Sequence, residues 1–464
     1  MLYIRMVLLM LVNLYTSRVV LNEFGIEDYG LYSIVGAIVI FLGFINISMS
    51  ASSLRFLSYY QGKGNFEELS ATFNSVLVVQ FFISLLILVI GETFGILYIE
   101  KFLNVSFEKV PVAHIVYQFS LFSFIVKTLT VPYSSFILAN EKMNIYALFS
   151  IVEALLQLVA VFILKALRTD KLIIYAMMMF ITIFMVQLCY RIYCMMKFKE
   201  CRFRKNWNKV TIKNLFSYSG WNLLGSLSAV AIDQGINMIL NSFFGVVVNA
   251  ARGIAFQVSG AIASLSGNFQ QALNPQIVKT FACNEKERMH QLIMNGTRFC
   301  YFLLLMLSIP VLFNMKALLE LWLGIVPDYA EVFCKLVLIN SLVSAFSGSL
   351  LMGAMATGNI KKYQIIVATI NLLNIPVSIT ALYLYSDPYV TAYIMIALSA
   401  TAFVARLLLT SRLIGMSIPL FLQKTIIPSV MTTLLSVLMT FGISIFIAAD
   451  NNFWALVIRM LLSY

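Results

Sequence analysis

Apolar stretches of roughly 20 residues recur from one end of this 464-residue chain to the other. An α-helix rises about 1.5 Å per residue, so each stretch is long enough to cross a hydrocarbon core of about 30 Å. Hydrophobic residues make up 61% of the chain and charged residues 11%, whereas ordinary globular domains carry about 25% charged residues. The sequence therefore predicts an all-α integral membrane protein with no soluble domain.

The hydrophobic pattern predicts fourteen helices, and the expected fold has twelve to fourteen transmembrane helices. The predicted segments are 1–21, 30–58, 72–99, 112–139, 145–166, 172–197, 214–243, 249–275, 290–314, 329–357, 361–384, 388–413, 424–448 and 453–464. The opening segment lacks a small-residue cleavage site, so we expect a first membrane helix and not a signal peptide. The final segment rises only about 18 Å, so we expect helix fourteen to be incomplete.

The longest polar break, KFKECRFRKNWNKVTIK, divides the first twelve helices into two groups of six. We expect an N-terminal six-helix lobe at 1–197, a basic cytoplasmic linker at 198–213, a C-terminal six-helix lobe at 214–413 and additional C-terminal helices at 414–464. Six helices per lobe make both copies cross the membrane in the same sense. That arrangement predicts two bundles related by a pseudo-two-fold axis around a central cavity.

A short internal repeat supports this division. The motif LNEF at 21–24 returns as LNSF at 240–243, and GAI at 36–38 returns at 260–262. Recurrence of motifs at matching places in two halves is the signature of duplication.

Basic residues gather in alternate loops, which predicts the orientation in the membrane. Loops after even-numbered helices carry Lys63, Lys142, Lys279, Lys286, Arg288, Lys361, Lys362, Arg412 and Lys424, and the long break adds seven more. The opposite loops hold Lys101, Lys109, Lys165, Arg168 and Lys171. We therefore expect a cytoplasmic N-terminus. Because topology accounts for the net charge of +12, no nucleic-acid partner is expected.

Charged residues inside predicted helices need a role, because each costs at least about 2.5 kcal/mol near the bilayer centre. Lys127 lies near the middle of helix four, before Pro132, whose ring permits a bend. We expect it to face the cavity as a cation. The alternative is a structural pair with Glu153 of the next helix.

Asp233 lies near the centre of helix seven, beside Gln234 and Asn237, which mark a wet face. It is a candidate for ion coupling, as is Glu153, and the alternative for Asp233 is a pair with a basic residue across the cavity.

Arg18 and Arg252 lie at comparable depth near the outer ends of helices one and eight. Together they could hold a diphosphate, since arginine offers planar bidentate donors and keeps its charge. The alternative for each is snorkelling to the outer headgroups, and Arg298, about two turns inside helix nine, is open to both interpretations. Glu23 and Asp28 are expected in a solvated outer turn.

No pattern for chemistry accompanies these charges. The six cysteines form no CxxC pair and there are two histidines, so we expect no disulfide framework, metal site or cofactor. The sequence also lacks GxSxG and the P-loop GxxxxGK[ST], and its outer loops are too short for a membrane polymerase or ligase. We expect a protein that is not an enzyme.

Five stretches resemble the Wzx-type polysaccharide flippases, often called O-antigen or lipopolysaccharide biosynthesis transporters, of the multidrug/oligosaccharidyl-lipid/polysaccharide exporter superfamily. They are TSRVVLNEFGIEDYGLYSIVGAI, VPYSSFILANEKMNIYALFSIVEALLQL, GWNLLGSLSAVAIDQGINMILNSFFGVVVNAARGIAFQVSGAI, NFQQALNPQIVK and LELWLGIVPDYAEVF. The resemblance covers almost the whole chain, and VNAARGIAFQV with NPQIVK is its most specific part.

The resemblance implies a MATE-like fold in the bacterial inner membrane whose two lobes open alternately to either side. The implied substrate is an undecaprenyl-diphosphate-linked oligosaccharide, and the implied cationic cavity uses arginines that carry over to Arg18, Arg55 and Arg252. We further expect contact with membrane lipids, coupling of transport to H⁺ or Na⁺, and association with the polysaccharide polymerase machinery. The protein is expected to be a monomer. The rival is a MATE-type cation-coupled multidrug antiporter, whose cavity would favour acidic residues.

Overall fold

The computed structural model describes residues 43–101, 109–166, 170–204, 206–323 and 326–446, with scattered positions between 5 and 39. Over these residues the chain is helical and contains no strand. The chain divides into two compact units, unit 1 (Met1–Leu223) and unit 2 (Leu224–Tyr464). The division falls inside one continuous helix, α8 (Lys209–Phe244).

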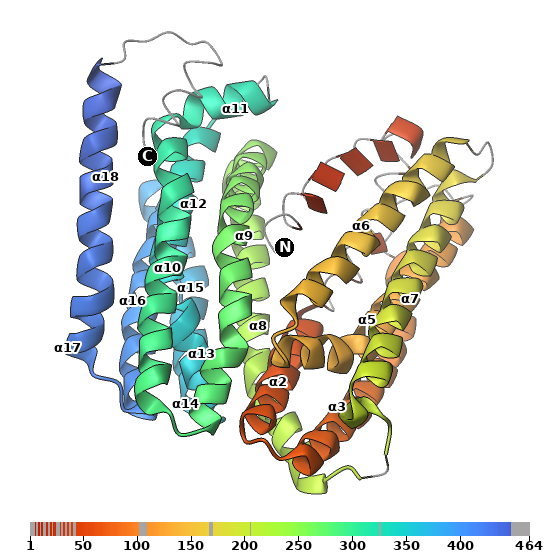
Figure 1. Ribbon diagram of the computed structural model, residues 1–464. Coiled ribbons are helices and arrows are strands. Elements are labelled where there is room, and N and C mark those ends of the chain that lie inside the picture. The colour runs from red at the N-terminus through yellow and green to blue at the C-terminus, as the bar shows by residue number, and fades with distance from the viewer. Residues whose placement is uncertain are drawn as a thin grey trace. The chain divides into compact units, whose positions relative to one another are not determined.

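Unit 1 is a bundle organised around α5. Its helices are α2 (Gly43–Gly62), α3 (Phe66–Ile90), α4 (Ile96–Lys101), α5 (Val110–Ala139), α6 (Met143–Ala166) and α7 (Lys171–Lys197), with a π-helical turn at Gly91–Gly95 and a 3-10 turn at Lys199–Cys201. Within the unit, α5 contacts α2, α3, α6 and α7 (Figure 1). The ring of Phe73 on α3 packs edge-on against Tyr133 and Phe136 of α5, with centroids 5.3 and 5.6 Å away. Such pairs add about 0.5–1.5 kcal/mol beyond area burial, which fastens α3 to α5.

Unit 2 is organised around α9 and α16. Its helices are α9 (Val246–Ala282), α10 (Lys286–Phe313), α11 (Met315–Leu323), α12 (Ala330–Ala345), α13 (Gly348–Ala356), α14 (Lys361–Leu372), α15 (Asn374–Tyr385), α16 (Val390–Ile414), α17 (Ile418–Phe421) and α18 (Ile427–Phe446), with a π-helical turn at Leu422–Ile426. α9 contacts α10, α12 and α13, while α16 contacts α12, α13, α14 and α15 (Figure 1). Tyr301 and Phe346 stack at 4.4 Å in this core.

Ten helical stretches in the described part of the chain are long and apolar enough to cross a membrane. The all-α integral membrane fold predicted from hydropathy is confirmed. The predicted segments at 112–139, 145–166 and 172–197 begin within two residues of α5, α6 and α7. The predicted segments at 1–21 and 453–464 lie outside the continuously described ranges.

Two predicted helices are each divided into two. The segment predicted at 329–357 is α12 and α13, separated at Phe346 and Ser347, and the segment predicted at 361–384 is α14 and α15, separated at Leu373. Ser347 precedes Gly348, a weak helix former, and Pro376 cannot donate the next backbone hydrogen bond. The short helix α11 was not predicted.

Two acidic residues of the outer turn bind lysines far along the chain. Glu23 Oε2 lies 2.7 Å from Lys171 Nζ, and Asp28 Oδ1 lies 2.7 Å from Lys109 Nζ. All four side chains are partly buried. These residues were expected in a solvated turn, and the structure adds partners that sequence spacing does not reveal.

Candidate functional site: intramembrane arginines and their partners

In unit 2, Arg252 of α9 binds two residues of α8. Its Nη2 lies 2.9 Å from Asp233 Oδ1, and its Nη1 donates to the side-chain oxygen of Asn237 and to the Asp233 carbonyl, the latter at 3.5 Å. Asp233 and Asn237 are four residues apart, so they share one face of the helix. The structure therefore joins two residues that the sequence selected for separate roles, and the basic partner of Asp233 comes from the next helix of the same unit.

The two members of this pair differ in exposure. The Arg252 side chain is 8% exposed, while that of Asp233 is 45% exposed. The guanidinium also lies over the ring of Phe256, one turn further along α9, at 4.4 Å from the centroid, a cation–π arrangement. Gln234 Nε2 donates to the second Asp233 oxygen at 3.2 Å. The arginine is thus fixed in place, and its counterion is the more accessible partner.

A small cavity of about 20 Å³ lies beside Arg252. It is lined by Ile232, Ile236, Arg252, Phe256, Phe333, Val337, Asn374, Thr391, Ala392 and Met395. This volume holds about one water molecule, so a sugar or diphosphate does not fit there in this conformation. Access to Arg252 requires the helices that line the cavity to separate.

In unit 1, Arg55 of α2 is buried among aromatic rings. Its guanidinium carbon lies 4.6 Å from the Phe56 centroid, 5.0 Å from that of Tyr59 and 5.6 Å from that of Tyr218 on α8. In the sequence analysis Arg55 was assigned to the site by resemblance alone, and its contacts with these three aromatic rings were not predicted. Tyr59, four residues after Arg55, was the available signal, whereas Tyr218 is 163 residues away.

Lys127 of α5 pairs with Glu153 of α6. The Nζ–Oε1 distance is 3.2 Å, and both side chains are partly exposed. The pair held open as the alternative is therefore present. Because the Lys127 side chain is partly exposed, pairing with Glu153 does not bury the lysine charge in the core.

Arg298 and Arg18 are the remaining two candidate arginines. Arg298 of α10 is partly exposed, and its guanidinium carbon lies 5.9 Å from the Phe299 centroid. Within the described residues it has no ion pair. Arg18 lies outside the described residues, so its predicted role stays a prediction.

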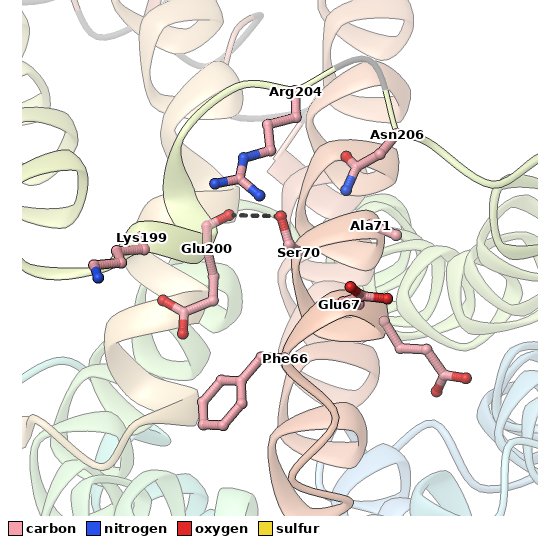
Figure 2. Close-up of a pocket in the computed structure, with 9 residues that line it drawn as sticks. Phe66, Glu67, Ser70, Ala71, Lys199, Glu200, Arg204 and Asn206 are labelled. Carbon is pink, nitrogen blue, oxygen red and sulfur yellow. Dashed lines mark hydrogen bonds between the residues drawn. The ribbon is translucent and has the colours of Figure 1, made fainter.

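The segment after α7 is fastened to α3. Ser70 Oγ donates to the Glu200 carbonyl at 3.5 Å, the Arg204 amide donates to Asn74 Oδ1 at 3.0 Å, and the Asn208 amide donates to Ser75 Oγ at 3.1 Å. Beside these bonds lies a recess of about 690 Å³, called here the linker recess. It is lined by Phe66, Glu67, Glu68, Ser70, Ala71, Lys199, Glu200, Arg204 and Asn206. In Figure 2 the Ser70–Glu200 bond lies at its middle, between Arg204 and Phe66.

Two groups at this end of unit 1 have raised pKa values. Burial, followed by a hydrogen bond with Cys194, raises the pKa of the Cys201 thiol. A hydrogen bond with Tyr59 raises the pKa of Lys63, which lies in the loop between α2 and α3. At neutral pH Cys201 is therefore a thiol and Lys63 a cation. Among the residues that the structure describes, no group of three His, Cys, Asp or Glu side chains is placed to hold a metal.

Several solved transporter structures share this fold. A MATE crystal structure in the straight conformation gives a TM-score of 0.77 at 11% identity, over 89% of this chain and 93% of the other. A MOP superfamily transporter from Pyrococcus furiosus, described as having a binding pocket of reverse polarity that suggests a different function, gives 0.73 at 12% identity, over 89% and 94%. The Vibrio cholerae MATE transporter VcmN in its bent form gives 0.70 at 15% identity, over 89% and 95%. The predicted MATE-like fold is confirmed.

The sequence comparisons identify the family. The chain matches none of the curated proteins with which it was compared. A family model described as polysaccharide biosynthesis protein matches residues 1–281, which is more than half of the 464 residues. The resemblance noted from the sequence is therefore confirmed at the level of the family, and the chain belongs to the polysaccharide biosynthesis protein family.

Proposed function

We propose that this protein is a bacterial inner-membrane flippase that moves undecaprenyl-diphosphate-linked oligosaccharide from the cytoplasmic to the periplasmic leaflet by alternating access. A membrane transporter fold and membership of a polysaccharide biosynthesis family support the proposal. The observation that carries it is the buried Arg252 of α9, held by Asp233 and Asn237 of the candidate membrane span α8.

The chemistry of the substrate explains why such a site is needed. Each glycan hydroxyl costs a few kcal/mol to bury unpaired in hydrocarbon, roughly 2–7 kcal/mol for an isolated polar group, so unassisted flipping is slow. A protein path removes this penalty by offering polar partners. The diphosphate requires a cation that stays charged in a membrane, and arginine does so with a bidentate donor pair.

The Arg252–Asp233 pair also suggests how binding and release are linked. A diphosphate that binds Arg252 takes the place of the Asp233 carboxylate. The freed carboxylate then takes up H⁺ or Na⁺, since an unpaired anion in a membrane is costly. Return of Asp233 to Arg252 expels both the ion and the diphosphate. We propose the same exchange for Glu153, which pairs with Lys127.

The other cations extend the proposed path. Arg18, Arg55 and Arg298 contact the substrate as the two units open and close, and Asn, Gln, Ser and Tyr side chains bind the sugars. The protein acts as a monomer with its N-terminus in the cytoplasm and delivers its product to the polysaccharide polymerase machinery.

A second candidate is a MATE-type cation-coupled multidrug antiporter. The half-exposed carboxylate of Asp233 favours it, because an acidic group attracts cationic drugs and coupling ions. The remaining intramembrane charges are mostly basic, which favours an anionic substrate. The Pyrococcus furiosus transporter, with its pocket of reverse polarity, is a precedent for a different function on this fold.

The test is deletion of the gene in its own host, with complementation by wild type, Arg252→Gln and Arg288→Gln at matched protein levels. Arg288 lies exposed in the first turn of α10 and pairs with Glu285, so its variant is a matched control. We expect lipid-linked glycan to accumulate on the cytoplasmic leaflet in the deletion strain and with Arg252→Gln, and to be cleared by wild type and Arg288→Gln. If the deletion strain instead keeps its surface glycan unchanged and becomes sensitive to cationic dyes, the flippase proposal is wrong and the antiporter takes its place.

A further inference from the structure

The segment between α7 and α8 combines basic charge with exposed aromatic rings. Residues 197–213 contain seven Lys or Arg residues and one acidic residue, Glu200. Phe203 and Trp207 are 61% and 39% exposed, and their ring centroids lie 6.4 Å apart. Met196, just before the segment on α7, and Val210, in the first turn of α8, are exposed as well. Large apolar side chains left uncovered by protein indicate a contact with something else.

The location of the segment identifies that contact. It joins two candidate membrane spans, Lys171–Lys197 and Lys209–Phe244, so both of its ends are tied to helices that cross the membrane. Aromatic side chains such as that of Trp207 are favoured at the membrane–water interface, because their rings are largely apolar while a polar group such as the indole N–H can reach water. Phe66, at the start of α3 and on the wall of the linker recess, adds a further exposed ring (Figure 2).

In the part of this segment that the structure describes, ion pairs do not neutralise the basic side chains. Among the residues that the structure describes, Lys199, Arg202, Arg204, Lys209 and Lys213 form no ion pair. Glu67 and Glu68 lie across the recess, and with Glu200 they reduce the positive balance without cancelling seven basic residues. Each cation near a membrane surface attracts anionic headgroups, an effect that falls off within a Debye length.

The hydrogen bonds to α3 hold this surface in place. The backbone amides of Arg204 and Asn208, and the Glu200 carbonyl, are bound by Asn74, Ser75 and Ser70. Because backbone groups make these bonds, the side chains of Phe203, Arg204 and Trp207 remain available to a ligand. A fixed backbone also lowers the entropy cost of binding.

We infer that residues 197–213 form a binding surface for anionic phospholipid headgroups of the adjoining leaflet, with Arg202, Arg204 and Lys199 contacting phosphate and Phe203 and Trp207 inserted among the lipids. The surface is separate from the Arg252 and Lys127 pairs and does not depend on which substrate the protein moves. It anchors the segment between α7 and α8 of unit 1 to the membrane.

The experiment uses full-length protein in nanodiscs with Trp207 as the sole tryptophan, made by Trp221→Phe, Trp322→Phe and Trp454→Phe. Brominated phosphatidylglycerol and brominated phosphatidylcholine are compared as quenchers at the same mole fraction. We expect phosphatidylglycerol to quench Trp207 more strongly, and Arg202→Gln/Arg204→Gln to lower this preference by at least about five-fold. The matched control is Lys286→Gln/Arg288→Gln, which removes two charges from the first turn of α10 and leaves the preference unchanged.

The same quenching measurement at increasing salt, on protein with the unmutated segment 197–213, keeps the test independent of any folding defect in the variants. The preference for the anionic lipid should fall between low salt and about 1 M, where the Debye length is about 3 Å. Equal quenching by the two lipids would overturn the inference, as would a preference that neither salt nor the linker variant alters. Absence of quenching by either lipid would place Trp207 away from the membrane and overturn it as well.

Discussion

The Arg252–Asp233 pair can be tested residue by residue with a double-mutant cycle. Asp233→Asn leaves a buried guanidinium without its counterion, and we expect a loss of about 1–3 kcal/mol in the free energy of unfolding. Arg252→Leu removes the cation, and in the double variant the two losses should overlap, with a coupling energy of about 0.5–3 kcal/mol. Denaturant unfolding in detergent measures all four proteins. Additivity within about 0.5 kcal/mol would show that the contact contributes nothing to stability.

Sequence reasoning selected both members of this pair but assigned them to different roles. Asp233 lies eleven residues before the end of α8, and Arg252 six residues after the start of α9. At about 1.5 Å per residue their backbones differ in depth by roughly 8 Å. Counting residues along the helices therefore does not predict that the two side chains meet. The long arginine side chain bridges this difference. The same limit applies to Arg55, because the Tyr218 ring beside it comes from a distant helix.

At the scale of single elements, the π-helical turn after α3 depends on Gly95. A Cβ at this position would lie 1.9 Å from the Tyr117 hydroxyl oxygen, and that hydroxyl donates to the Gly91 carbonyl at 2.8 Å. We expect Gly95→Ala to displace the Tyr117 ring, break this bond and cost about 1–3 kcal/mol of unfolding free energy.

Gly220→Ala on α8 is the matched control for Gly95→Ala. A Cβ there meets no atom within 4 Å, and alanine is the better helix former by about 1 kcal/mol. Thermal unfolding of the purified proteins should therefore give a lower midpoint for Gly95→Ala and an equal or higher midpoint for Gly220→Ala. If both variants unfold like wild type, the close approach of Tyr117 does not constrain position 95.

Hydropathy predicted the position of most membrane helices but none of their interruptions. A window of about 20 residues averages over Ser347, Gly348 and Pro376, so α12 with α13 and α14 with α15 each read as one helix. The nine residues of α11 are too few to register in the same window. Their pattern is amphipathic, with Met315 and Leu319 buried and Lys316 and Glu320 exposed, which a shorter window would detect.

At the scale of the whole molecule, the alternation of basic loops predicts which side of the membrane each loop faces. The loop after α9, with Cys283, and the end of α15, with Tyr385, lie on opposite sides, because three crossings separate them: α10, α12 with α13, and α14 with α15. The loop after α9 carries the basic residues, so the positive-inside rule assigns it to the cytoplasm. Cys283 and Tyr385 are both exposed.

We expect a membrane-impermeant maleimide to label a single-cysteine Tyr385→Cys variant in intact spheroplasts and to label Cys283 only after permeabilisation. Cys201, predicted in the same compartment as Cys283, is the control for reactivity. Burial hides its thiol and raises its pKa, so it should stay unlabelled in permeabilised cells and react when the protein is denatured. Labelling of Cys283 in intact spheroplasts, with Tyr385→Cys protected, would invert the whole topology. The Arg252 pair, counted from the start of α9, would then lie near the cytoplasmic side, and the proposed path would have to begin at that pair instead of ending there.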